Sequence, residues 1–96
     1  MEIATLQKWA AEHFGAKTDA LSLDYGVARL LVQAGQLGEA VLSETDVDKE
    51  IVDVLFVLVS LANRCNIDLA QASERYLYER SPKEILARIS GEGGDA

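Results

Sequence analysis

Apolar residues recur every three or four positions through most of the chain, a spacing that places them on one side of a helix. The first such segment covers about residues 2–14, and Gly15 follows it as a candidate left-handed helix end. No stretch alternates apolar and polar residues for long enough to predict a strand. The pattern therefore predicts an all-α protein.

Capping residues divide the rest of the chain into four further helices. We expect them over residues 24–42, from the Thr45–Asp48 capping signal to Arg64, over residues 68–79, and from the Ser81–Glu84 boundary to Ile89. Ser22 and Asp68 are the candidate N-caps of the second and fourth helices of the chain. Residues 1–90 then form a single helical domain, and the glycine-rich residues 91–96 form a flexible tail.

The second and third predicted helices are apolar around most of their circumference, over residues 27–42 and 51–62. A chain of 96 residues cannot cover both surfaces by itself. We expect the two helices to form an antiparallel hairpin, and two hairpins from two chains would complete a four-helix-bundle core. The sequence therefore predicts a homodimer or a tetramer built from two dimers.

Composition and charge narrow the range of partners. The chain has 16 acidic and 9 basic residues, a net charge of −7, so it lacks the basic surface that binding of duplex nucleic acid requires. Its longest apolar stretch, residues 51–62, is shorter than a membrane span, and no signal-peptide pattern precedes it. Cys65 and His13 are the only cysteine and histidine, which excludes an internal disulfide and multi-histidine metal sites. We expect a cytoplasmic protein that binds neither duplex nucleic acid nor a membrane.

An acidic pair interrupts the most apolar helix. Asp53 lies within residues 51–58, where an unpaired buried carboxylate costs several kcal/mol, and Glu50 is three residues earlier on the same helical face. Two such carboxylates are typical of Mg²⁺ sites. The alternative is that Asp53 faces water at one end of the bundle or pairs with Arg29 or Arg64.

Two amides stand on the preceding helix. Gln33 and Gln36 are also three residues apart in an otherwise apolar segment, and they could face Glu50 and Asp53 across the hairpin. They form either a hydrogen-bonded polar layer or one side of a ligand site.

The segments 30–41, 50–56 and 61–69 together resemble the MazG-like branch of the all-α nucleoside triphosphate pyrophosphohydrolases, over about residues 24–80. The resemblance implies a four-helix, metal-dependent enzyme that splits a nucleoside triphosphate into a monophosphate and pyrophosphate. The metal motif of this family is Glu-Glu-x-x-Glu on one helix and Glu-x-x-Asp on the next.

The resemblance assigns Glu50 and Asp53 as Mg²⁺ ligands, but Val32, Gln33 and Gln36 stand where the family has glutamates. Gln33 and Gln36 are thus degenerate catalytic positions, and the lost charge weakens the ability to hold metals and to activate water. We therefore expect weak or absent pyrophosphohydrolase activity. The alternative is a non-catalytic helical dimer that binds a nucleotide or a protein partner.

The resemblance also implies substrate contacts further along the chain. Asn63 matches an asparagine that is common after the second motif, and Arg80 and Lys83 lie where similar proteins contact phosphates. The alternatives are a helix end for Asn63 and a solvated surface for the two basic residues. Trp9, His13 and Phe14 share one side of the first helix and could stack on a base, but a place in the hydrophobic core is the better explanation for Trp9 and Phe14.

Overall fold

The computed structural model describes residues 1–91, and within that range its regular elements are all helical. They are α1 (Ile3–Asp19), α2 (Leu23–Ser43), α3 (Val47–Arg64), α4 (Leu69–Ser73), the π-helical segment η1 (Glu74–Tyr78) and α5 (Pro82–Ser90). The prediction of an all-α protein is confirmed. The predicted tail lies, beyond Gly91, outside the described residues.

Three helix starts follow from local side-chain capping, as the sequence predicts. Ser22 Oγ accepts a hydrogen bond from Tyr25 N at the start of α2. In the same way Asp68 caps α4 through Gln71 N, and Ser81 caps α5 through Glu84 N. Each cap satisfies a backbone donor that the helix itself leaves unpaired.

Two predicted boundaries are wrong. α1 continues through Gly15 to Asp19 in right-handed conformation, and the hydroxyl of Thr18 donates to Gly15 O inside the helix. Thr45 does not cap α3, because its hydroxyl donates backward to Ser43 O. The turn instead places Glu44 and Asp46 in left-handed conformation, which reverses the chain between α2 and α3 within three residues.

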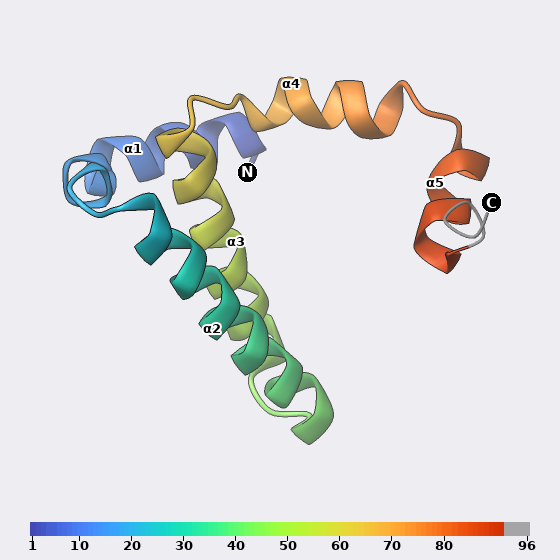
Figure 1. The fold of residues 1–96 in the computed structure, drawn as a ribbon, viewed down its shortest axis with the longest axis horizontal. Coiled ribbons are helices and arrows are strands. Elements are labelled where there is room, and N and C mark those ends of the chain that lie inside the picture. Colours follow the sequence, from blue (N-terminus) through green and yellow to red (C-terminus); the bar gives the residue numbers. More distant parts are fainter. Residues whose placement is uncertain (92–96) are drawn as a thin grey trace.

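α2 and α3 run side by side as an antiparallel hairpin, and α1 crosses α3 near the end far from the turn (Figure 1). The buried apolar residues are small and few: Ala10, Ala40, Val57, Val59 and Ala62. At Gly26, an added Cβ would lie 2.7 Å from Leu61 Cδ2, so a glycine there lets α2 approach α3 closely.

Much apolar surface of the hairpin stays uncovered in the single chain. Leu31 and Leu42 of α2 are 68% and 88% exposed, and Val52 of α3 is 59% exposed. An added Cβ at Gly35 or Gly38 would meet no described atom within 4 Å, so these two glycines face open space. Exposed apolar patches of this kind are typical of interaction surfaces.

The remaining elements, α4, η1 and α5, form an extension that we name the C-terminal arm (residues 69–90). It leaves the body where α4 contacts α1, and at its far end α5 bends sharply away from the direction of α4, at a distance from the hairpin (Figure 1). Over the described residues, no helix combines the length and the apolar character that crossing a membrane requires.

Candidate functional site

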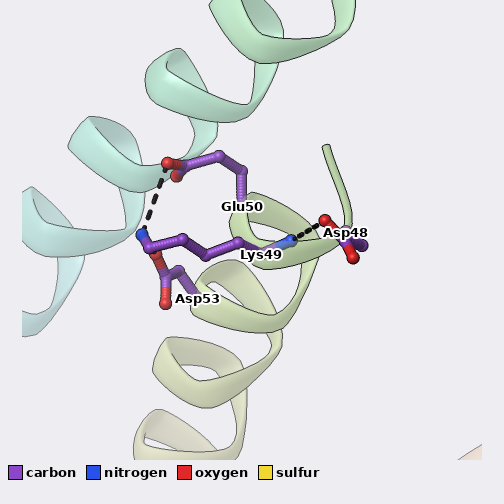
Figure 2. A network of polar contacts seen from close by, with 4 residues as sticks. All are labelled: Asp48, Lys49, Glu50 and Asp53. Atoms are coloured by element: carbon purple, nitrogen blue, oxygen red, sulfur yellow. Dashed lines mark hydrogen bonds and ion pairs between the residues drawn. The ribbon is translucent and has the colours of Figure 1, made fainter. Parts of the chain in front are cut away.

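The first two turns of α3 bring the predicted metal ligands together, with Lys49 between them (Figure 2). Lys49 Nζ lies 2.9 Å from Asp53 Oδ2 and 3.6 Å from Glu50 Oε1. The Glu50 side chain is 17% exposed and that of Asp53 is 38% exposed. The two carboxylates therefore share one cation supplied by their own helix.

The cationic partner of Asp53 is Lys49. The sequence suggests water, Arg29 or Arg64 as its partner, but the structure pairs it with Lys49, at four residues' separation. Arg64 instead donates to the backbone oxygens of Thr18 and Leu21, where it holds the link between α1 and α2. Asp53 is also more exposed than its apolar neighbours suggest, and Glu50 is the more buried of the two acids.

The acidic pair keeps Lys49 charged. Its hydrogen bond to Asp53, and then the negative charges of Asp53 and Glu50, raise the pKa of Lys49 above its ordinary range. At neutral pH the ammonium group is therefore positively charged and acts as the counter-ion of both carboxylates. It is nevertheless 66% exposed at the end of a flexible chain, so a stronger cation can displace it.

Gln33 lies on the other helix of the hairpin. It is 7% exposed and lies with Ala40 among the buried residues of α2, whereas Gln36 is exposed. Gln33 Oε1 and Glu50 Oε2 are both buried, and no group of the described chain donates a hydrogen bond to either. A buried acceptor in that state costs about 1–3 kcal/mol. The two helices that pack against each other therefore each hold an oxygen that a cation or a donor would satisfy.

The donor set suits magnesium only in part. Within residues 1–91, no group of three or more histidine, cysteine, aspartate or glutamate side chains is placed to hold a metal. The carboxylates of Glu50 and Asp53 are oxygen donors of the kind that Mg²⁺ prefers, and Mg²⁺ often takes its other ligands from substrate phosphates. Two carboxylates are too few for a site made by the protein alone, so a metal here would need further ligands from a bound phosphate.

An apolar cavity of about 140 Å³ opens between the first half of α2 and the second half of α3, at the end of the hairpin where the link between α1 and α2 lies. Tyr25 and Phe56 are among the residues that line it. Its lining includes neither Gln33 nor the acidic pair, and Phe56, three residues after Asp53, is the lining residue closest to that pair along the chain. No sequence motif predicts the cavity, but Gly26, where the two helices approach closely, indicates its position.

Asn63 lies in a different environment from the one that the resemblance implies. Its Oδ1 accepts from Gln7 Nε2 at 3.0 Å, and its Nδ2 donates to Gln7 O at 3.0 Å. The structure therefore places Asn63 in a contact between α1 and α3, apart from Glu50 and Asp53.

The structure also separates the other two predicted substrate contacts from the acidic pair. Arg80 lies over the ring of Tyr76, with 5.8 Å from Cζ to the ring centroid, and Lys83 is exposed on α5. Both belong to the arm, which the chain holds away from the turn of the hairpin (Figure 1). Of the aromatic residues, Phe14 packs edge-on against Phe56 with 5.3 Å between ring centroids, a contact that joins α1 to α3.

Comparisons of the chain with protein-family models, with curated proteins and with solved structures find no match.

Proposed function

We propose that the hairpin binds a nucleoside triphosphate together with Mg²⁺ and hydrolyses it weakly or not at all. The observation that carries this proposal is that each helix of the hairpin holds a buried oxygen without a donor, Gln33 Oε1 on α2 and Glu50 Oε2 on α3, and that Glu50 shares Lys49 with Asp53. A protein leaves buried acceptors unpaired at a cost in stability, and such atoms often mark a ligand site. The similarity of residues 24–80 to the MazG-like family supports the same function.

The chemistry of the side chains suggests which residues bind the metal and which bind the nucleoside. Glu50 and Asp53 hold the metal by their carboxylates, and the Gln33 amide contributes a neutral oxygen. The cavity lined by Tyr25 and Phe56 is apolar, but at about 140 Å³ it has room for only part of a nucleoside. Mg²⁺ supplies charge neutralisation for the phosphates and lowers the pKa of a bound water.

Any residual hydrolysis is a displacement at the α-phosphorus. A water oxygen forms a bond to that phosphorus, the bond to the bridging oxygen of the β-phosphate breaks, and a proton passes to solvent or to a carboxylate. Val32, Gln33 and Gln36 provide no negative charge for a second cation. We therefore expect binding to be easier to detect than turnover.

Self-association belongs to the same proposal. The exposed apolar faces of α2 and α3, and the two glycines that face open space, favour pairing with the hairpin of a second copy into a four-helix bundle. We propose a homodimer, or a tetramer of two such dimers.

The second candidate function is a helical dimer without catalysis, which binds a nucleotide or a protein. Lys49 favours it, because its ammonium group already compensates part of the acidic charge without a metal. The release of pyrophosphate separates the two candidates.

Calorimetry with Mg²⁺ and a non-hydrolysable nucleoside triphosphate analogue tests the proposal. The variant Asp53→Asn should lose at least about tenfold in Mg²⁺-dependent affinity, since it removes a charged ligand. Asp48→Asn is the matched control, because Asp48 is in the same first turns but accepts only from a backbone amide, Lys49 N. If the two variants bind alike, or if the unmodified protein does not bind, the proposal is wrong.

A further inference from the structure

α5 presents an apolar side to open space. Leu86 and Ile89 are 64% and 78% exposed, and Tyr78 at the end of η1 is 80% exposed. Together with Pro82 and Ile85 they line a concavity of about 440 Å³ in the corner between η1 and α5. A helix of nine residues is marginal in water unless its apolar side is buried. The corner is therefore shaped for an apolar partner.

The hairpin tip, which we define as residues 39–53, offers a surface of the same kind. Val41 and Leu42 end α2, and Ile51 and Val52 begin α3; they are 53%, 88%, 51% and 59% exposed. The tip also concentrates negative charge, because it holds six carboxylates and one basic residue, Lys49. The acidic residues are Glu39, Glu44, Asp46, Asp48, Glu50 and Asp53.

The charges of α5 complement those of the tip. Helical spacing places Lys83 and Arg88 on the two flanks of the apolar side, and Glu84 away from it. Two arms packed together would bring these basic residues near their own copies, and two tips packed together would do the same with carboxylates. An arm against a tip joins apolar surface to apolar surface and basic residues to acidic ones.

We propose that the apolar side of α5 docks on the hairpin tip of a second copy, and that the two copies exchange arms reciprocally about a two-fold axis. This inference rests on the self-association in the proposed function. It assigns the apolar residues of the tip, Leu42 and Val52 among them, to the arm of the second copy, so that the two hairpins pair through the rest of α2 and α3. The exchanged arm brings Arg80 and Lys83 close to Glu50 and Asp53 of the other copy. Within one chain, the described contacts of the arm do not bring these residues together. The acidic site is then completed by the second copy.

Sedimentation velocity on the full chain tests the exchange through two matched variants. Leu86→Gln should weaken the dimer about 100-fold, since each of two arms loses a buried leucine. Glu84→Gln introduces the same side chain on the opposite side of α5 and should leave the dimer unchanged. Leu86 is largely exposed within one chain, so its replacement does not disturb the monomer. Equal association by the two variants overturns the inference.

Photo-crosslinking identifies the surface that the arm touches. Unlabelled chains carry the photoreactive residue benzoyl-phenylalanine in place of Leu86. These chains are mixed with ¹⁵N-labelled chains of the natural sequence. Mass spectrometry should find crosslinks from the arm to residues 39–53 of the labelled chain. Crosslinks to another arm, or only within one chain, contradict the exchange.

The outcomes separate this inference from the proposed function. A protein that stays monomeric at every concentration overturns both self-association and arm exchange, while Mg²⁺-dependent nucleotide binding remains a separate measurement. A dimer that Leu86→Gln does not weaken overturns the exchange alone. If Leu86→Gln abolishes binding of a monomer to vesicles of anionic lipid, the arm is a membrane-binding element and the exchange is wrong.

Discussion

Gln7 in α1 and Gln33 in α2 are buried to almost the same degree, 9% and 7% exposed, but their hydrogen bonding differs completely. Gln7 Nε2 donates to Asn63 Oδ1 and Ile67 O, and Gln7 Oε1 accepts from Leu69 N. Gln33 Oε1 receives no hydrogen bond from the described chain. The two residues belong to two regions with different tasks.

The region around Gln7 joins three helices by polar contacts that are all internal. One side chain links α1 to the end of α3 and to the first amide of α4, so no ligand is needed to satisfy it. The region around Gln33 leaves a buried acceptor of α2 without a donor. Burial of an amide alone therefore does not distinguish the two glutamines, whereas the unpaired oxygen of Gln33 does, because a buried group without a partner calls for a further explanation.

The largest expected effect is the loss of the Gln7 contacts. Gln7→Leu removes the partners of Asn63 Oδ1, Ile67 O and Leu69 N, and we expect it to lower the free energy of unfolding by about 3 kcal/mol. Gln33→Leu, the matched change at the other buried glutamine, should raise the free energy of unfolding by about 1–3 kcal/mol, because it removes a buried acceptor that has no donor. Urea denaturation of both variants measures the difference. Similar losses in both would remove the distinction between the two regions.

A second test adds negative charge to α2 at the positions of Gln33 and Gln36. Gln33→Glu combined with Gln36→Glu should raise Mg²⁺ affinity at least about tenfold and produce or increase pyrophosphate release, because carboxylates replace neutral amides. Without metal the variant should melt at a lower temperature, since clustered carboxylates repel one another, and Mg²⁺ should restore it. Pyrophosphate assays and melting curves with and without Mg²⁺ check this. Robust turnover by the natural sequence would show that the missing carboxylates matter less than we argue.

The smallest expected effect comes from the internal cation. Lys49→Met keeps the length of the side chain but frees Asp53 and Glu50 from their shared counter-ion, so Mg²⁺ affinity should rise about fivefold, as expected for a solvated charge pair at contact distance. Lys8→Met is the control, because Lys8 forms an exposed pair with Glu12 on α1. Mn²⁺ binding followed by electron paramagnetic resonance compares the two. An equal affinity in both variants would mean that Lys49 does not compete with the metal.

Local signals in the sequence predicted the helices well. Ser22, Asp68 and Ser81 cap the amides three residues ahead of them, so each start is decided within a few residues. The pairing of Glu50 with Asp53 on one face also followed from helical spacing. The end of α1 did not, because Gly15 permits a left-handed end but does not require one.

Periodicity and composition were enough to predict an all-α chain, an acidic pair on α3 and an excess of apolar surface on both α2 and α3. Only the tertiary structure decided which glutamine is satisfied, because the partners of Gln7 are 56–62 residues away along the chain. It also decided that Asn63 packs against α1 and that the arm stands apart from the hairpin (Figure 1). Periodicity specifies which side of a helix is apolar, but the element that this side meets depends on turns and long-range contacts that no local pattern encodes.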